Sequence, residues 1–471
     1  MNKLSLSTVA ILLAMTMAFG AHAKDYYFSP SEAGQMKALL KSESLKPGDN
    51  VILRDGIYDS IGRVDIVARG TADDTISIRP EHPGKVVFTG PLHFSLFGEY
   101  IKLDGLYFNK AWALGGEMIG FRKSKTEMAS NCRMTNCVID DCNNPEMSES
   151  GKLIDGKKPA AEYWIKIYGE NNRLDHCYLA NKRVGGLVLQ VEFNDDLHIN
   201  NHIIDHNVFG NRNPYYGNGA EIIRIGHSWS SQLESRTIVE DNVFLHCDGE
   251  NEIISVKSCH NVLRGNLFFE SSGGLVCRHG HYNVIENNTF IGNNKRGTSG
   301  IRIINQGHTV YDNFMARLDD LSLLVRMGVF ERPTAQTDIK AEPLTSYHRV
   351  ENVDFSYNHF VDCPKIILCS GRGDKSPRNV RFANNNIVGT TNNIMFHDPD
   401  KNLKGFFFIN NKYNFKDNSV IPFKGFDGTE HFDEAWGEVE KERVVRLLDK
   451  VGVPSYSPSQ RDMEYILKGY L

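Results

Sequence analysis

Short stretches in which apolar and polar residues alternate recur along most of the chain. Residues 75–79 and 85–88 alternate in this way, and turn residues such as glycine, proline and aspartate flank them. Alternation with a period of two predicts β-strands that bury one face. The stretches follow one another too closely for crossover helices to fit between them. The pattern therefore favours an all-β protein.

A short unit, an asparagine followed within two positions by a hydrophobic residue, repeats through the middle and C-terminal parts of the chain. Its copies are spaced by roughly 22 to 30 residues, with longer gaps where loops are inserted. Self-similarity at this period predicts a solenoid, and units made only of short strands predict a right-handed parallel β-helix. Asparagines at one position of each coil can form a hydrogen-bonded ladder and tolerate left-handed turns. The copies begin at Asn136, Asn207, Asn242, Asn266, Asn288, Asn358, Asn385 and Asn411, with weaker copies at Cys177 and Asp312.

Both ends of this repeat carry helical patterns. Residues 31–40 begin with a serine and have helical apolar spacing, which predicts a short helix that caps the open edge of the stack. Residues 430–450 have an apolar side formed by Val444, Val445, Leu447 and Leu448, and the pattern breaks at 452–454. We therefore predict a β-helix domain over residues 24–430 and a C-terminal helical cap or tail over residues 431–471.

The first 23 residues have the pattern of a secretory signal peptide. Lys3 precedes an apolar run over residues 4–19, and residues 21–23 form a small-residue cleavage site. This pattern predicts cleavage after about Ala23 and a periplasmic or secreted protein. No later run approaches the roughly 20 apolar residues of a membrane span, so we expect none in the mature protein.

Composition narrows the range of partners. The chain of 471 residues has 53 basic and 58 acidic residues and a net charge of −5, which gives no indication of nucleic-acid binding. Nine cysteines are an odd number, and their spacing fits neither a disulfide framework nor a CxxC metal site. Cys142, Cys247 and Cys363 are predicted to be small core residues. We expect a monomer or a weak oligomer.

One stretch concentrates residues that can carry chemistry. Glu250, Glu252 and Lys257 lie close together in sequence, and Arg278 follows Lys257 by 21 residues. Residues one coil apart in a β-helix lie about 4.8 Å apart. The repeat therefore predicts that Lys257 and Arg278 share one wall of a groove, to which neighbouring coils add Asn218 and Arg302.

The two glutamates of this stretch can bind a cation. Glu250 and Glu252 share one face of a strand because side chains alternate with a period of two. Together with the amide oxygen of Asn218 they form a plausible partial shell for Ca²⁺. Lys257 has the opposite parity to Glu252, so the prediction requires a bend or bulge between these two residues.

These motifs resemble polysaccharide lyase family six, the family of alginate lyases and chondroitinase B. The resemblance is carried by residues 249–258, by residues 278–280 and by Asn218 with residues 223–226, and it extends from about residue 47 to about residue 313. It implies a calcium-dependent lyase on a parallel β-helix. By position it implies that Asn218, Glu250 and Glu252 bind Ca²⁺, that Lys257 is the base and that Arg278 is the acid.

The implied reaction is β-elimination in a polymer that contains uronates. A base removes the C5 proton, the C4 oxygen leaves, and a cation on the carboxylate stabilises the developing enolate. Lys257 must be neutral to accept the proton, and nearby positive charge lowers its pKa. Water could replace Arg278 in protonating the leaving oxygen.

An anionic polysaccharide is therefore the expected substrate, and alginate is the preferred candidate. Arg302 occupies a position where the alginate lyases of the family look to carry an arginine, and an added guanidinium suits a polymer with a carboxylate on every sugar. Arg224, His279 and His281 are further expected substrate contacts, although both histidines could equally be turn residues. Alternatives are a dermatan sulfate lyase like chondroitinase B, a C5 epimerase and a non-catalytic glycan-binding β-helix.

Overall fold

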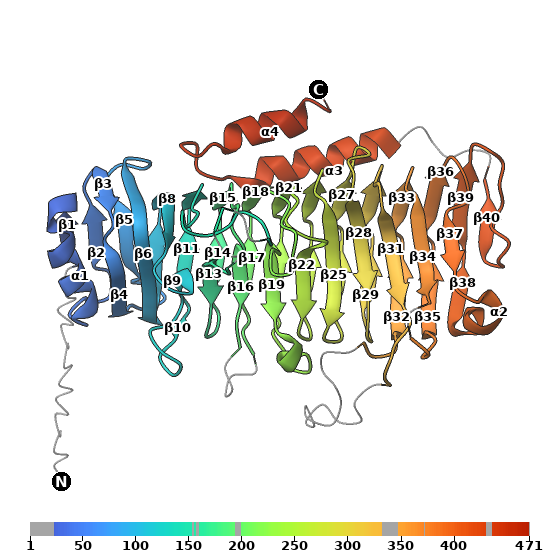
Figure 1. Cartoon of the computed structure of the whole chain (residues 1–471), viewed down its shortest axis with the longest axis horizontal. Helices are drawn as coiled ribbons and strands as arrows, with labels where there is room; N and C mark the ends of the chain where they lie inside the picture. The colour runs from blue at the N-terminus through green and yellow to red at the C-terminus, as the bar shows by residue number, and fades with distance from the viewer. Residues whose placement is uncertain are drawn as a thin grey trace, which may run out of the picture.

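Three rows of parallel strands run side by side along the molecule and form a solenoid (Figure 1). The computed structural model describes residues 23–152, 155–156, 160–193, 199–331, 347–371, 373–429 and 436–470. Each coil of the solenoid passes through the first, second and third row in turn before it enters the next coil. The predicted parallel β-helix is confirmed.

The first row is a 14-stranded parallel sheet. Its strands are β1 (Asp25–Phe28), β2 (Asn50–Leu53), β5 (Ile76–Pro80), β7 (Ile101–Asp104), β11 (Arg133–Thr135), β14 (Arg173–Asp175), β17 (Ile203–Asp205), β20 (Ile238–Glu240), β23 (Val262–Arg264), β26 (Val284–Glu286), β29 (Thr309–Tyr311), β32 (Glu351–Ser356), β35 (Arg378–Ala383) and β38 (Phe406–Ile409).

The second and third rows are joined by the long strand β6 (Val86–Glu99), which pairs with strands of both. The second row consists of β3 (Gly56–Asp59), β8 (Tyr107–Ala113), β12 (Val138–Asp140), β15 (Tyr178–Ala180), β18 (Val208–Arg212), β21 (Val243–Cys247), β24 (Leu267–Phe269), β27 (Thr289–Ile291), β30 (Phe314–Ala316), β33 (His359–Val361), β36 (Asn386–Gly389), β39 (Asn411–Phe415) and β40 (Phe426–Gly428). The third row consists of β4 (Gly62–Arg69), β9 (Glu117–Gly120), β13 (Tyr163–Ile167), β16 (Leu189–Val191), β19 (Ile223–Gly226), β22 (Glu252–Lys257), β25 (Gly273–His279), β28 (Thr298–Ile303), β31 (Leu321–Arg326), β34 (Lys365–Ser370) and β37 (Ile394–Phe396), and the two-residue β10 (Ala129–Ser130) pairs with β6.

A ladder of buried asparagines stabilises the turn between the first two rows. From Asn207 to Asn385, each side-chain amide donates a hydrogen bond of 2.9–3.0 Å to the amide oxygen of the next ladder member, and the last acceptor is Asn411. Asn313 is a full member, as the weaker copy at Asp312 suggested. Asn136 is not, because Cys137 occupies the equivalent position one residue later. The left-handed conformation is adopted by the residue before each ladder asparagine, such as Asp241 at φ 52°, and not by the asparagine itself.

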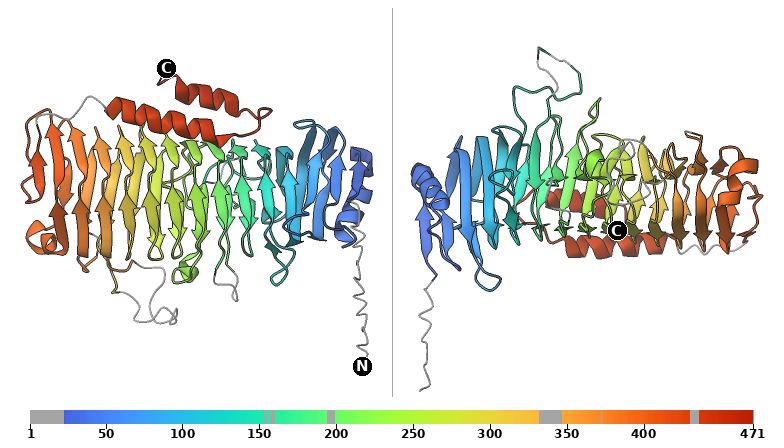
Figure 2. Two further views of the ribbon diagram at one scale, coloured as in Figure 1. Left: turned by 180° about the vertical axis from the view of Figure 1, so that it is seen from behind. Right: turned by 90° about the horizontal axis from the view of Figure 1, so that it is seen from below.

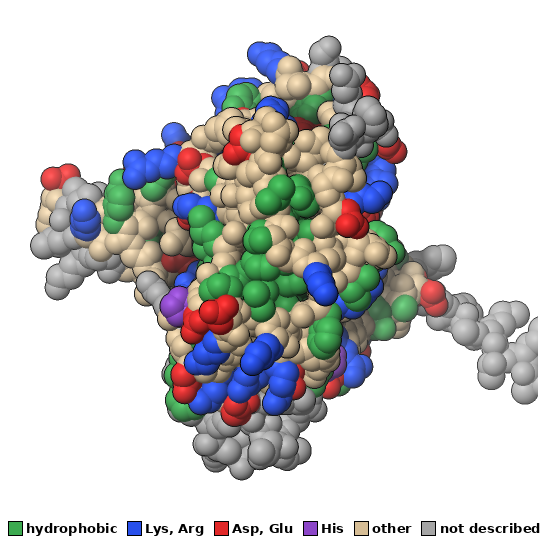
Figure 3. Space-filling view, turned by 90° about the vertical axis from the view of Figure 1, so that its right-hand side faces the viewer, with side chains coloured by type: hydrophobic (Ala, Val, Ile, Leu, Met, Phe, Trp, Pro, Cys, Tyr) green, Lys and Arg blue, Asp and Glu red, His purple; other side chains and the backbone are tan. Residues whose placement is uncertain are grey.

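The interior of the solenoid is apolar, and stacked phenylalanines such as Phe244, Phe268 and Phe290 repeat along it. All nine cysteines are free and buried, which confirms the predicted core positions of Cys142, Cys247 and Cys363. At the C-terminal end, hydrophobic side chains gather in the middle of the end face (Figure 3), as expected where a stack of coils ends.

Helices lie at the N-terminal end and along one flank (Figures 1 and 2). The 3₁₀ turn η1 (Pro30–Glu32) leads into α1 (Ala33–Lys41), which buries Met36 and Leu40 at the first coil, as the predicted capping helix should. Helices α3 (Trp436–Val451) and α4 (Ser459–Leu467) pack along the second row. The remaining helical segments are η2 (Ser228–Ser230), α2 (Pro399–Asn402) and η3 (Leu403–Gly405).

The predicted signal peptide lies outside the described residues apart from Ala23. Among the helices that the structure describes, none is long and apolar enough to cross a membrane.

Candidate active site

A cleft with a volume of about 690 Å³ opens on the outer face of the third row. Seven of the nine predicted site residues line it. The lining consists of Tyr215, Gly217, Asn218, Gly219, Glu221, Arg224, Glu250, Asn251, Glu252, Lys257, Arg278, Arg302, Leu321, Arg326 and Tyr347. Asn218 and Arg326 lie 108 positions apart in the chain, and the coil repeat brings them to the same face.

The irregularity that the sequence requires is present in β22. Its pairing with β25 shifts between Glu252 and Ile254, and again between Val256 and Lys257. Ile254 and Val256 are buried in the core, so Ser255 and Lys257 face outward. Because of the first shift, Glu252 also faces outward despite its opposite parity.

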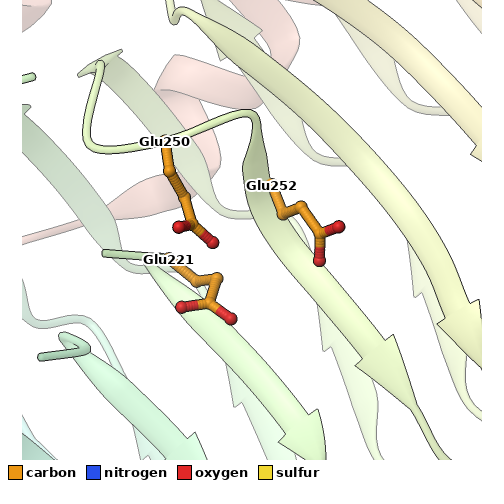
Figure 4. A group of neighbouring side chains, drawn as sticks. All are labelled: Glu221, Glu250 and Glu252. Atoms are coloured by element: carbon orange, nitrogen blue, oxygen red, sulfur yellow. The ribbon is translucent and has the colours of Figure 1, made fainter. Parts of the chain in front are cut away.

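Three carboxylates lie close together in the cleft. Oxygen atoms of Glu221, Glu250 and Glu252 lie within 4.8 Å of one another, and Figure 4 shows Glu221 and Glu250 pointing toward each other, with Glu252 on the adjacent strand. Asn218 lies at the exposed rim of the same cleft. Glu250 accepts a hydrogen bond of 3.1 Å from the backbone N–H of Gly219.

The electrostatics of this cluster favour a bound cation. Burial raises the pKa of Glu250 to about 8, and the like charges of Glu221 and Glu252 add to the effect. The buried Oε2 atom of Glu221 has no hydrogen-bond partner among the described residues. Carboxylates that are buried and close together need positive charge, and oxygen ligands of this kind suit a hard cation such as Ca²⁺.

Arginines surround the third carboxylate. Arg302 forms an ion pair with Glu252, and the Nε atom of Arg278 lies 4.0 Å from the same carboxylate. Arg278 also donates a hydrogen bond to the hydroxyl of Tyr347, and its guanidinium lies 4.8 Å from the centre of the Tyr347 ring. This part of the cleft can therefore bind negatively charged groups of a ligand.

Lys257 lies between the acidic and the basic groups. Its amine is 3.9 Å from a Glu221 oxygen, and its side chain is only 16% exposed. Burial lowers the pKa of Lys257, Glu221 and Glu252 oppose this change, and the positive charges of Arg224 and Arg278 add to it. A lysine in this environment can act as a base more readily than a solvated one.

A buried arginine supports the loop that carries Glu221. Arg212 is 2% exposed, and its guanidinium donates hydrogen bonds to the carbonyls of Ala220 (3.0 Å), Val184 (3.2 Å) and Gly186 (2.8 Å). A side chain at Gly249 would lie 2.3 Å from the Ala220 carbonyl oxygen and 2.7 Å from the Arg212 Nε atom, so only glycine fits there. Arg212 therefore holds the loop in place from the interior of the solenoid.

The two predicted histidines lie outside the cleft lining. His279 is 3% exposed, and burial lowers its pKa to about 3, so its imidazole is neutral. His281 is buried as well, and a ring nitrogen of His281 lies 3.1 Å from the amide nitrogen of Gln232. Neither histidine belongs to the cleft lining, because both side chains are buried.

Several cleft residues were not singled out from the sequence. Glu221 could have been found, because β19 and β22 pair Ile223 with Ile254, and the same offset places Glu221 beside Glu252. Tyr347 enters from a segment of the chain for which the repeat gives no register, so the sequence pattern carries no signal for it.

Comparisons with known proteins agree with this geometry. A family model described as Chondroitinase B matches residues 35–446. A mannuronic acid specific polysaccharide family 6 lyase from human gut microbiota is 55% identical over 95% of this chain and 100% of its own, with a TM-score of 0.90. The family 6 alginate lyase AlyGC is 33% identical over 92% of this chain, with a TM-score of 0.77, and this chain spans 57% of AlyGC. No curated protein matches the chain.

The protein is a polysaccharide lyase built on a parallel β-helix, as its fold, its cleft and its relatives together indicate. Within this class, the chain belongs to the Chondroitinase B family, polysaccharide lyase family 6.

Proposed function

We propose that the protein is a calcium-dependent alginate lyase that cleaves mannuronate-rich polymer by β-elimination. The observation that carries the proposal is the presence of three carboxylates, a partly buried lysine and four arginines in one open cleft. The mannuronic acid specific relative and AlyGC support alginate as the polymer.

The residues present fit a calcium ion. Glu221, Glu250 and Glu252 would hold it, and Asn218 at the rim could add an amide oxygen. The unpartnered oxygen of Glu221 and the raised pKa of Glu250 support this assignment, because both indicate a cluster that lacks positive charge. When bound, Ca²⁺ would neutralise the substrate carboxylate and stabilise negative charge that develops on it.

Lys257 is proposed as the base. Its amine would take the proton from C5 of the uronate, which lies next to the carboxylate. Burial lowers the pKa of Lys257 and so increases the fraction of neutral amine available for this step.

Arg278 is proposed to act on the departing oxygen at C4. Its guanidinium already donates a hydrogen bond to the Tyr347 hydroxyl, so it can donate in the same direction to a substrate oxygen. A guanidinium is a weak acid, and water can deliver the proton that the leaving oxygen finally takes up. Arg302 and Arg224 are proposed to bind substrate carboxylates or hydroxyls.

A dermatan sulfate lyase is the second candidate, because the family model that matches carries the description Chondroitinase B. Export to the periplasm or the medium stays a prediction from the signal peptide.

The test is incubation of the purified protein with poly-mannuronate, poly-guluronate and dermatan sulfate, each with Ca²⁺ or with excess chelator. The proposal predicts ultraviolet absorbance from a new C4–C5 double bond, fastest with poly-mannuronate and only with Ca²⁺. Product without this absorbance would refute β-elimination, and full activity in chelator would refute the role of the metal. A faster reaction with dermatan sulfate would favour the second candidate.

A further inference from the structure

The floor of the cleft continues toward the N-terminal end of the solenoid. Arg224 pairs in register with Gln190 of β16, and Gln190 pairs with Lys166 of β13. The Arg224 guanidinium donates a hydrogen bond of 2.6 Å to the Gln190 side chain and contacts the Tyr163 hydroxyl at 3.5 Å. The Lys166 amine lies 4.2 Å from the centre of the Tyr163 ring. One continuous row of polar side chains therefore leads out of the cleft.

An exposed tryptophan forms the wall beside this floor. Trp229 lies in η2, directly after β19, and its side chain is 41% exposed. Its ring lies nearly parallel to the ring of His227, with an angle of 11° and centroids 5.9 Å apart, and edge-on to Phe193. Gly226, next to this segment, pairs in register with Lys257. The wall is thus one coil away from the proposed base.

The charges on this floor are already paired. Lys166 lies 3.7 Å from Glu117 and 3.4 Å from Glu192. His227 contacts the other Glu192 oxygen at 2.5 Å. Burial would raise the pKa of Glu192, but the hydrogen bond from His227 and the charge of Lys166 outweigh it, so the pKa is lowered and the carboxylate stays charged.

The two halves of the binding surface therefore differ in chemistry. On the C-terminal side, Arg278 and Arg302 share the single carboxylate of Glu252, which leaves positive charge for a ligand. On the N-terminal side, Glu117 pairs with both Lys166 and Arg122, and Glu192 pairs with Lys166 and contacts His227, so the basic groups there already have acidic partners and leave less positive charge for a uronate carboxylate.

We propose that Trp229, supported by His227, is a stacking subsite for a sugar ring of the polymer, one or more residues away from the bond that is cleaved. The apolar C–H face of a pyranose packs against the indole ring, while the Glu192 carboxylate accepts a hydrogen bond from a ring hydroxyl. Recognition at this subsite is by ring shape and hydroxyls, and recognition on the C-terminal side is by carboxylates. This inference rests on the proposed function, since it names how the same polymer binds beyond the reacting sugars.

A subsite away from the reacting atoms binds ground state and transition state equally. Trp229→Ala should therefore raise KM for long poly-mannuronate by about tenfold and leave kcat unchanged. Because Trp229 is exposed and lies in a loop, the variant should keep its thermal midpoint.

The direct test is fluorescence titration with a mannuronate hexasaccharide in a Lys257→Ala background, which prevents turnover. Tryptophan emission should change on binding, the change should be lost with Trp229→Phe, and it should remain with the matched control Trp436→Phe. Calorimetry on the same samples, and on Trp229→Ala in the same Lys257→Ala background, reports binding independently of any fluorophore.

Three outcomes are possible. Loss of the signal in Trp229→Phe together with weaker calorimetric binding in Trp229→Ala supports the subsite. Calorimetric binding that is unchanged by Trp229→Ala overturns the subsite and leaves the proposed function standing. Absence of calorimetric binding of the hexasaccharide to the Lys257→Ala protein overturns both.

Discussion

Replacement of Arg212 tests how the interior of the solenoid supports the acidic cluster. Arg212→Met removes a buried guanidinium that donates three hydrogen bonds to backbone carbonyls, at 2.8, 3.0 and 3.2 Å. Methionine fills much of the volume but leaves these carbonyls without a partner. Each hydrogen bond from a charged donor contributes about 1.5 kcal/mol or more, and methionine avoids the cost of burying a charge.

The expected net effect is a loss of about 3 kcal/mol in the free energy of unfolding. In urea this corresponds to a fall of about 0.5 M in the unfolding midpoint for a chain of this size. Arg212→Lys retains the positive charge near Glu221 and Glu250 but not the fork geometry, so it should fall between the wild type and Arg212→Met.

Replacement of Arg212 should also weaken calcium binding. The Ala220 carbonyl precedes Glu221 directly, so loss of its hydrogen bond releases the loop that carries a proposed ligand. Supporting residues of metal sites typically contribute 10- to 100-fold to affinity. Calorimetric titration of Ca²⁺ into Arg212→Lys should show about a tenfold weaker Kd. An unchanged midpoint and an unchanged Kd would refute the idea that Arg212 anchors this loop.

Other consequences can be measured in parallel. Glu221→Gln should raise the Ca²⁺ concentration needed for half-maximal activity by about 10- to 100-fold, because a carboxylate ligand is lost; an unchanged requirement would exclude Glu221 from the metal site. Asn288→Ala removes side-chain hydrogen bonds at 2.9–3.1 Å, including those to both neighbouring ladder asparagines. It should lower the free energy of unfolding, measured in urea, by about 3 kcal/mol. The control Asn213→Ala, at an exposed position, should lower it by less than about 0.5 kcal/mol. Arg302→Ala should reduce kcat/KM on poly-mannuronate by about tenfold or more, and an unchanged kcat/KM would argue against a contact between Arg302 and a substrate carboxylate.

The repeat made most of the fold predictable from the sequence. Asparagine spacing identified the coils because each ladder residue must satisfy the same buried hydrogen bonds, so the same side chain recurs at the same place. The capping helix was predictable from its serine start and apolar spacing. The prediction that Asn136 belongs to the ladder was wrong, because Cys137 takes the ladder position in that coil and Asn136 is only its sequence neighbour.

The site was predictable where residues follow the coil register and unpredictable where they do not. Lys257 and Arg278 were placed together by their spacing, and the required bulge after Glu252 is present. Glu221 was overlooked although the register of β19 and β22 places it beside Glu252. Alternation alone does not predict that His279, at the end of β25, and His281, just after it, are both buried.

The central claim is that this cleft cleaves by elimination, and the origin of the oxygen in the product tests it most directly. Poly-mannuronate is digested with Ca²⁺ in ¹⁸O-labelled water, and the oligosaccharides are analysed by mass spectrometry, with the Lys257→Ala protein as control. Elimination predicts unsaturated products without ¹⁸O at the cleaved bond and no product above background from Lys257→Ala. Saturated products that carry ¹⁸O, or undiminished cleavage by Lys257→Ala, would contradict the account.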